Sequence, residues 1–328
     1  MGKTHLGVYE RLAGVEVTAL NDVRREALEI TSLDSGGNIA ASSGAIDLSG
    51  VKKYTDYTKM LEEGGFDAVD ICLPTYLHAE YSVQALEHGY HCFCEKPLAL
   101  SARECDRVLD AEAKSGRVFS VGQCLRFWPA YTEAKRIIDG GKYGSAKYAE
   151  LSRYSPTPRW GWDNWLLDAK RSGGAALDLH VHDVDTVLWF FGKPSSVRSQ
   201  AVFEKGGGAS HISTVYSYDG RAVTSTGGWG FPARFPFNMR ALYLLEGAAI
   251  EMDFAKNPVL SLWPAEGERQ AVALPEGDGY YHELESFARS VEAGKSAGVV
   301  SGQSAAEAVR LCLLEVESAR TGRELKLP

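Results

Sequence analysis

The sequence predicts an α/β protein in two parts, an N-terminal doubly wound parallel sheet of the Rossmann type and a C-terminal α+β part with a large, mostly antiparallel open sheet. Up to residue 124, single helices alternate with strands, as they do in βαβ units. Residues 196–274 consist mostly of short β-runs separated by turn residues, which is typical of antiparallel sheets. A chain of 328 residues is also long for one domain. We therefore expect domains at 1–124 and 125–328.

The N-terminal part alternates between helical spacing and strand-like apolar runs. VEVTALND is a strand that ends in an acid, and YHCFCEKPL is the most apolar strand of this part. Ser101 and Glu104 form a capping box at the start of a helix that ends at Gly116. The expected elements are helix 2–13, strand 15–22, helix 23–30, loop 35–50, helix 58–63, strand 66–74, helix 78–89, strand 90–98, helix 101–116 and strand 117–125.

The C-terminal part combines helices with the β-runs. A long apolar helix ends at Gly192, and Pro194 follows it. The sequence contains no internal repeat and no low-complexity segment. The expected elements are helix 129–140, strand 147–156, helix 174–192, strands 196–204, 209–220, 222–229, 239–247 and 248–254, and helices 280–293 and 304–319.

Composition and charge argue against several classes of protein. Apolar residues make up 45% of the chain and charged residues 24%, and no basic block interrupts the net charge of −8, so we expect neither nucleic acid nor a membrane as partner. No apolar run reaches the ~18 residues of a membrane span. Cys92 and Cys94 share one strand face and no second pair follows at zinc-site spacing. We interpret Cys92 and Cys94 as core thiols and expect a cytoplasmic protein without a metal site.

Asp22 ends the strand VEVTALND at the place where a Rossmann unit carries an acid that binds the adenosine ribose. Such an acid would repel a 2′-phosphate, so it favours NAD over NADP. Arg24 complicates this interpretation because it could accept a 2′-phosphate. Strand ends are also often acidic simply because they reach solvent.

Two further strands break at residues suited to a ligand cleft. ICLPTYLH breaks at Leu73, Pro74 and Thr75, which brings backbone to the carboxyl edge of the sheet, where open α/β folds bind ligands. EKPL places Glu95 and Lys96 at the same edge. There, the Lys96 ammonium could stabilise a developing oxyanion or polarise a carbonyl. The alternatives are an ordinary strand-to-helix turn and a surface Glu–Lys pair that contributes little.

The stretch GGAALDLHVHDVD carries a candidate acid–base pair. On a helix, Asp178 and His182 are four residues apart and share one face, so the carboxylate could orient the imidazole. Asp185, three residues beyond His182, is a second possible orienting group. His180 points elsewhere, so the two histidines do not form an i,i+4 metal pair. His182 could equally be a satisfied core histidine on a very apolar helix.

EKPL and GGAALDLHVHDVD, in this order and about 75 residues apart, resemble the Gfo/Idh/MocA oxidoreductases, and the resemblance extends through DGYYHELESFARSVEAGK to the closing helix. It implies an NAD-dependent (or NADP-dependent) oxidoreductase of a sugar, polyol or related carbohydrate, assembled as a dimer or tetramer through the C-terminal sheet. Lys96 matches the family's active-site lysine, and Asp178 and His182 match its acid–base pair. The cofactor-binding residues expected from the pattern and the resemblance are Gly2, Asp22, Arg24, Leu73, Pro74, Thr75, His78, Glu95, Lys96 and Gln123.

In the expected oxidation, His182 removes the hydroxyl proton, Lys96 stabilises the alkoxide and Asp178 orients the catalytic groups. The substrate itself is not specified by the sequence. Arg126 follows the domain crossover, and the loop TPRWGWDNWLLD offers aromatic rings and polar tips that suit a sugar, although its tryptophans could also only pack the junction. The expected substrate-binding residues are Arg126, Arg159, Trp160, Trp162, Asp163, Trp165 and Tyr280, with Tyr281 and His282 as further candidates.

The chain departs from the family pattern at two places. His180 stands where many members have glycine. The family also begins with a strand and G-x-G-x-x-G-x-x-H, of which only Gly2 and His5 remain here. We therefore expect no strand at the first, central position of the Rossmann sheet, a weakened cofactor site, and a natural start about 10–15 residues upstream of Met1.

Two other functions compete with the dehydrogenase. A branch of this fold is a glycoside hydrolase that uses NAD transiently, and net turnover without added oxidant would single it out. A ligand sensor could keep the fold without the chemistry. A sensor does not need an acid–base pair, so the presence of Lys96, Asp178 and His182 argues against that role.

Overall fold

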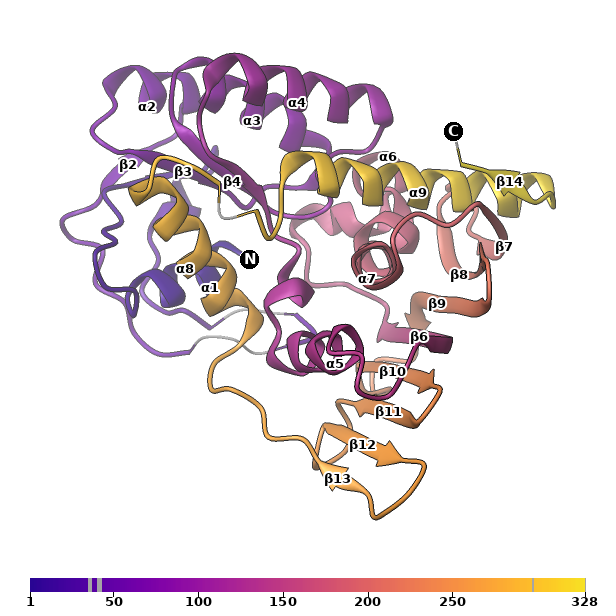
Figure 1. Ribbon diagram of the computed structural model, residues 1–328. Helices are drawn as coiled ribbons and strands as arrows, with labels where there is room; N and C mark the ends of the chain where they lie inside the picture. The colour runs from indigo at the N-terminus through magenta and orange to yellow at the C-terminus, as the bar shows by residue number, and fades with distance from the viewer. Residues whose placement is uncertain (35–36, 40–42, 297, 328) are drawn as a thin grey trace.

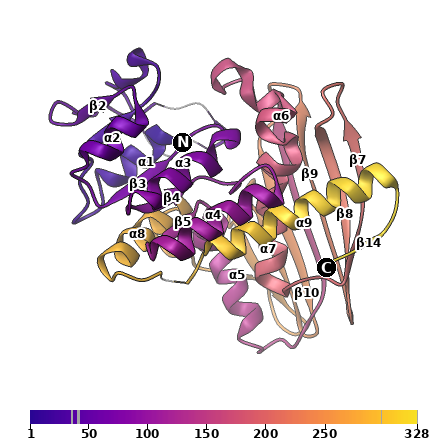
Figure 2. The ribbon, with the colours of Figure 1, turned by 90° about the horizontal axis from the view of Figure 1, so that it is seen from above.

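The computed structural model describes residues 1–34, 37–39, 43–296 and 298–327. Its N-terminal part carries short parallel strands covered by helices, and its C-terminal part is a single large sheet (Figures 1 and 2). The Rossmann-type parallel sheet and the large, mostly antiparallel sheet predicted from the sequence are both present. None of the described helices has an apolar stretch long enough to cross a membrane.

The parallel strands of the N-terminal part form two separate sheets. One pairs β1 (Ala19–Asn21) with β2 (Lys52–Tyr54), and the other has the order β3 (Ala68–Ile71), β4 (His91–Cys94), β5 (Phe119–Val121). All the pairings are parallel. A helix makes the crossover before β4 and before β5, whereas a long connection with a 3-10 turn joins β1 to β2. The helices of this part are α1 (Gly2–Tyr9), α2 (Tyr57–Glu63), α3 (Thr75–Glu87) and α4 (Ala102–Ser115).

A gap of one strand position separates the two sheets. In a Rossmann sheet of order 3-2-1-4-5-6, the strands β2 and β1 hold positions 3 and 2, and β3 to β5 hold positions 4 to 6. Within the described residues, no strand occupies position 1 and no ladder joins β1 to β3. The absence of a first strand, predicted from the lost glycine pattern, is confirmed. The facing edges of β1 and β3 border a large cavity instead.

The C-terminal sheet has nine strands in the order β13-β12-β11-β10-β6-β9-β8-β7-β14. Only the central pair β6–β9 is parallel. Apolar residues alternate inward along the strands, as the burial of Ala241, Tyr243 and Leu245 in β10 illustrates. The strand bounds are β6 (Ala146–Pro156), β7 (Ser196–Phe203), β8 (Ala209–Tyr218), β9 (Arg221–Phe231), β10 (Asn238–Leu245), β11 (Ala248–Asp253), β12 (Leu260–Pro264), β13 (Gln270–Ala271) and β14 (Leu325–Lys326).

The helices of the C-terminal part link the two sheets. In Figure 1, α9 (Gly302–Thr321) runs from the N-terminal sheet to the edge strands β7 and β14. Ser301 and Ser304 form a capping box at the start of α9. α8 (Gly279–Glu292) packs against α1, where Leu284 and Phe287 meet Val8 and Phe93. The other helices are α5 (Pro129–Asp139), α6 (Ala169–Ser172) and α7 (Val181–Phe191).

Several elements differ from the sequence-based expectation. The expected helix 23–30 is one 3-10 turn, Arg25–Leu28, and the expected strand 15–22 is ordered as a strand only over β1. The short strand β2 was not predicted, because KKY carries no apolar alternation. The expected helix 174–192 begins as a π-helix, Ala176–His180, before α7. In the expected loop 35–50, residues 35–36 and 40–42 lie outside the described part of the chain.

Candidate active site

A cavity of about 2370 Å³ lies between β1 and β3 and continues to the carboxyl ends of β3 and β4. Small-molecule sites usually measure about 300–1,000 Å³. This one is larger because it joins the ligand cleft of an open α/β sheet to the unfilled strand position. Lys96, Asp178 and His182 all line it; Lys96 contacts Asp178 directly, and the Lys96 charge acts on His182.

Lys96 reaches the cavity from the turn that follows β4. Its Nζ donates to the backbone carbonyl of Asp178 at 2.5 Å and lies 3.2 Å from Asp178 Oδ1. Both side chains are largely buried, at 15% and 18% exposed. The ammonium is therefore fixed by a partner from the C-terminal part, and its position depends on how the two parts of the chain pack.

The expected pairing of Asp178 with His182 is wrong in this structure. Asp178 lies in the π-helix, whose wider turn breaks the i,i+4 register, and its carboxylate accepts from Lys96 instead. The Nδ1 atom of His182 is buried and has no hydrogen-bond partner in the described chain. Both groups still face the cavity, with Lys96 beside Asp178. Short π-helical segments are frequent at functional sites, and this one places Asp178 beside Lys96.

The electrostatic surroundings keep His182 neutral. Burial lowers the pKa of its imidazole well below the ordinary value, and the charges of Lys96 and Arg153 lower it further. Arg153, in β6, is a cavity-lining residue that the sequence analysis missed. It is almost fully buried and makes a two-pronged ion pair with Asp183, with N–O distances of 3.1 and 3.0 Å. The imidazole is therefore neutral, which is the form that can accept a proton, and the two cations weaken it as a base.

Arg126 does not take the substrate-binding place expected for it. Its Nε and Nη2 atoms lie 2.9 and 2.7 Å from the two carboxylate oxygens of Asp185, and Nη1 donates to the carbonyl of Val299. Both side chains are buried and neither lines the cavity. This pair also removes Asp185 as a possible orienting group for His182. The two residues tie the turn after β5 to α7 and act structurally.

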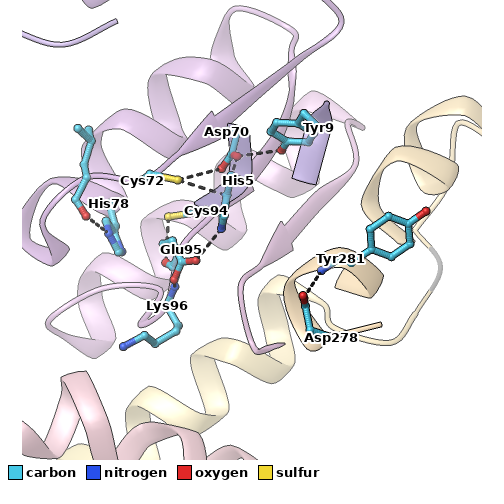
Figure 3. A network of polar contacts seen from close by, with 11 residues as sticks. His5, Tyr9, Asp70, Cys72, His78, Cys94, Glu95, Lys96, Asp278 and Tyr281 are labelled. Atoms are coloured by element: carbon cyan, nitrogen blue, oxygen red, sulfur yellow. Dashed lines mark hydrogen bonds and ion pairs between the residues drawn. The ribbon is translucent and has the colours of Figure 1, made fainter. Parts of the chain in front are cut away.

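Behind Lys96, a buried polar cluster surrounds His5 (Figure 3). Its Nδ1 lies 2.7 Å from Asp70 Oδ2 and its Nε2 lies 3.1 Å from Glu95 Oε1. Tyr9 also donates to Asp70, at 2.8 Å. Burial alone would lower the pKa of His5, but the Asp70 charge raises it well above the ordinary value. His5 therefore fits as an imidazolium between two carboxylates.

The residues expected to select the cofactor occupy the opposite end of the cavity. The guanidinium of Arg24 binds Asp22 through Nε and Nη2, at 3.2 and 3.1 Å, and both side chains line the cavity. The ring of Trp162 stacks over Arg24, with 5.2 Å between the guanidinium carbon and the ring centroid. Trp162 of the C-terminal part thus contacts the segment that follows β1. The Asp22 carboxylate is already paired with the Arg24 guanidinium.

The other expected cofactor residues divide into cavity-lining and buried groups. Gly2, Leu73, Pro74 and Glu95 line the cavity. His78 does not, because it is buried with its ring nitrogens each 2.7 Å from a carbonyl oxygen, those of Pro97 and Leu73. It ties the turn after β3 to the turn after β4.

Two of the expected cofactor residues near the carboxyl edge have buried polar atoms without a partner in the described chain. In the described chain, Thr75 Oγ1 and both amide atoms of Gln123 are buried without a hydrogen-bond partner, although neither side chain lines the cavity. Such atoms are costly to leave unpaired. With Asp22 at the adenosine end and Lys96 at the reactive end, the residues present fit a dinucleotide. Gly2, at the start of α1, lines the cavity and would contribute to holding its pyrophosphate.

The loop after β6 contributes aromatic rings to the cavity. Trp160, Trp162 and Trp165 line it, as does Tyr280 from α8. Tyr281 also lines it, whereas His282 bonds to the Glu276 carbonyl away from it. The other two expected substrate residues, Arg159 and Asp163, do not line it; Asp163 forms an exposed ion pair with Arg171.

The missed residues carried a signal in the sequence. Arg153 shares the inward face of its strand with Ala149 and Leu151, and a charge on an inward face is unusual. Glu283 lies on the apolar face of α8 between Tyr280 and Phe287 and is 1% exposed. A charged residue at an apolar position of an amphipathic pattern marks such sites.

Comparison with known proteins assigns the family. Residues 1–123 match the family described as oxidoreductase family, NAD-binding Rossmann fold, and residues 131–241 match the Gfo/Idh/MocA C-terminal domain. The chain belongs to the Gfo/Idh/MocA oxidoreductase family. The resemblance inferred from EKPL and GGAALDLHVHDVD is confirmed, and the first match assigns the NAD-binding fold to the N-terminal part.

Relatives include several sugar and polyol dehydrogenases. A scyllo-inositol 2-dehydrogenase (NAD(+)) of Bacillus subtilis is 35% identical over 44% of this chain and 41% of its own. Inositol 2-dehydrogenase 2 of Saccharopolyspora erythraea is 30% identical over 59% of this chain and 51% of its own. The chain spans about half the length, or less, of these curated relatives. A D-xylose 1-dehydrogenase (NADP(+)) of Haloferax volcanii is 27% identical over 100% of this chain and 98% of its own.

Among solved structures, a levoglucosan dehydrogenase in complex with NADH and levoglucosan superimposes with a TM-score of 0.84. The match covers 100% of this chain and 96% of that one, at 19% sequence identity. At such low identity, the likeness establishes the two-part fold and nothing about the substrate.

Proposed function

We propose that this protein is an NAD-dependent oxidoreductase acting on a CH–OH group of a sugar, an inositol-like polyol or a related carbohydrate. The observation that carries the proposal is the meeting of Lys96, Asp178 and His182 on one cavity wall, although they come from two parts of the chain. Supporting it, the tryptophan rings on the same cavity offer apolar faces of the kind that stack on sugars.

The residues divide the chemistry between a base and an electrostatic group. His182, kept neutral by burial and by neighbouring cations, accepts the hydroxyl proton of the substrate. The Lys96 ammonium stabilises the oxyanion that forms as the proton leaves. Asp178 holds Lys96 in place through its carbonyl and carboxylate. When bound, NAD would supply the acceptor for the hydride.

A screen for NADH formation tests the proposal. Inositols, aldoses, anhydrosugars and amino sugars are each offered with NAD, and the same screen is run with NADP. We expect steady NADH accumulation with at least one carbohydrate and none with matched deoxy compounds. Product formation without net NADH would point to the hydrolase that uses NAD transiently. Ligand binding without any turnover across the panel would point to a sensor.

We propose further that the protein assembles through the outer face of its C-terminal sheet. Cross-strand partners place Val215, Leu242, Leu244 and Trp263 on the face opposite the helices, and their exposed fractions are 42–54%. An apolar face of this kind on a sheet favours burial against a second copy. Light scattering of the purified protein should give a dimer or tetramer, and Leu242→Glu should give monomers. A wild-type monomer at working concentrations would refute the assembly.

A further inference from the structure

Glu283 of α8 is a buried carboxyl without a partner. It is 1% exposed, and neither carboxylate oxygen has a hydrogen-bond partner in the described chain. Yet a Glu283 oxygen lies within 4.8 Å of both a ring nitrogen of His5 and a Glu95 oxygen. The side chain is therefore directed into the polar cluster behind Lys96.

With Glu283 neutral, the cluster already carries two carboxylates against one imidazolium. His5 provides one positive charge and already faces Asp70 and Glu95. An ionised Glu283 would add a third carboxylate, itself buried and without a cation of its own, which is unfavourable. The charged groups that act on it include His5 and three acids, Glu95, Asp70 and Asp278. The titratable side chains of Tyr9, Cys124 and Tyr280 also interact with it, and all three are neutral because their pKa values are raised.

The Glu95 carboxylate fixes the turn that carries Lys96. Its Oε2 accepts the Lys96 backbone N–H at 3.1 Å, and its Oε1 lies against His5. Gly122 approaches it from the next strand so closely that a Cβ at that position would lie 3.2 Å from the carboxyl carbon. The Lys96 N–H, His5 and the close backbone of Gly122 thus surround the carboxylate, and Glu283 approaches it from α8.

We propose that Glu283 is a neutral carboxylic acid that, with His5, holds the Glu95 carboxylate in place and so serves as a positioning residue for Lys96. As an acid, Glu283 carries one O–H donor, and Glu95 is the acceptor that a small side-chain rotation would bring into reach. This inference rests on the proposed function only where it gives Lys96 a catalytic role. The protonation state of Glu283 is independent of that function.

The proposal predicts how stability changes with pH. Burial and the Glu95 charge raise the pKa of Glu283 well above its ordinary value, whereas the unfolded chain releases this proton near pH 4.5. Between about pH 4.5 and the pKa of the folded protein, the folded chain keeps a proton that the unfolded chain has lost. The free energy of unfolding should therefore fall as the pH rises through this range. Glu283→Gln, a neutral mimic of the acid, should remove this part of the slope.

The experiment compares wild type with Glu283→Gln, Glu283→Ala and the control Glu285→Gln, which lies on the same helix beside Arg289. At neutral pH, infrared difference spectra between wild type and Glu283→Gln should show the carbonyl band of a protonated carboxyl. From pH 5 to 9, the melting temperature of Glu283→Gln should equal or exceed that of wild type. Neither readout needs substrate or activity.

Enzyme activity tests separately whether Glu283 helps to position Lys96. Glu283→Ala should lower kcat at least tenfold with little change in KM, while Glu283→Gln should restore kcat to within about twofold of wild type. Equal loss in both variants, or no loss in either, would refute the positioning role. Absence of the protonated band would refute the neutral acid. So would a melting temperature that EDTA lowers only in the wild type, which would indicate a cation held by His5, Glu95 and Glu283.

Discussion

Replacing Asp183 by asparagine should lower the free energy of unfolding by about 3–5 kcal/mol, because it leaves the buried guanidinium of Arg153 without its counter-charge. The Arg153 and Asp183 side chains are 3% and 1% exposed, and two N–O contacts of 3.1 and 3.0 Å join them. The one other oxygen contact of this guanidinium is a hydrogen bond to the Tyr131 hydroxyl, which carries no charge. A domain is typically stable by only about 5–15 kcal/mol, so the loss should be easy to measure.

Urea denaturation followed by circular dichroism provides the measurement. Asp163→Asn is the matched control, because its ion pair with Arg171 is exposed at the acid and should contribute at most about 1 kcal/mol. The double variant Arg153→Met, Asp183→Leu removes both charges and should recover most of the lost stability. A loss below about 1 kcal/mol in Asp183→Asn, or a double variant as unstable as the single one, would refute the reasoning.

Three further predictions concern the cofactor end, the base and the gap. Asp22→Asn should shift the ratio of catalytic efficiencies toward NADP, whereas Arg24→Gln should shift it toward NAD; an unchanged ratio in both would show that neither residue selects. Because the pKa of His182 is lowered, the rate of oxidation should stay constant as the pH falls below 6.5 and should drop only where the imidazole gains a proton. Lys96→Met removes one neighbouring cation, so this acidic limb of the pH–rate profile should move to higher pH. Hydrogen exchange followed by mass spectrometry should be faster in β1 and β2 than in β6 and β9, since the former pair has three residues per strand and an unpaired edge; equal protection would contradict the description of the gap.

Helix and strand spacing, together with two motifs, were sufficient to predict the fold class and the placement of Lys96 and His182 on the cavity. EKPL ends an apolar strand, and parallel strands present their carboxyl ends at one edge, so Lys96 had to lie near the cleft. The long β-run region predicted antiparallel pairing, which the register of β7, β8 and β9 bears out. The absence of a strand at position 1 in the described chain was also predictable, because that strand precedes the glycine pattern, of which only Gly2 and His5 are present.

Residue-by-residue contacts were less predictable. Asp178 and His182 are four residues apart, but a π-turn separates them, and nothing in ALDLH distinguishes a π-turn from an α-helix. Arg126 was taken for a substrate ligand because it follows the crossover, yet its partner Asp185 lies 59 residues away in the chain. Such long-range pairs are set by tertiary packing. The same holds for Glu283, which meets Glu95 and His5 only when α8 packs on α1.

The most direct test of the proposed chemistry is the rate of NADH formation by Lys96→Met, measured with the carbohydrate that the screen identifies. Lys193→Met is the control, because Lys193 is an exposed lysine paired with Glu307. We expect Lys96→Met to lower kcat about a hundredfold or more while its melting curve stays close to that of the control, the usual scale for a group that stabilises developing charge. Wild-type turnover in a folded Lys96→Met protein would contradict the account.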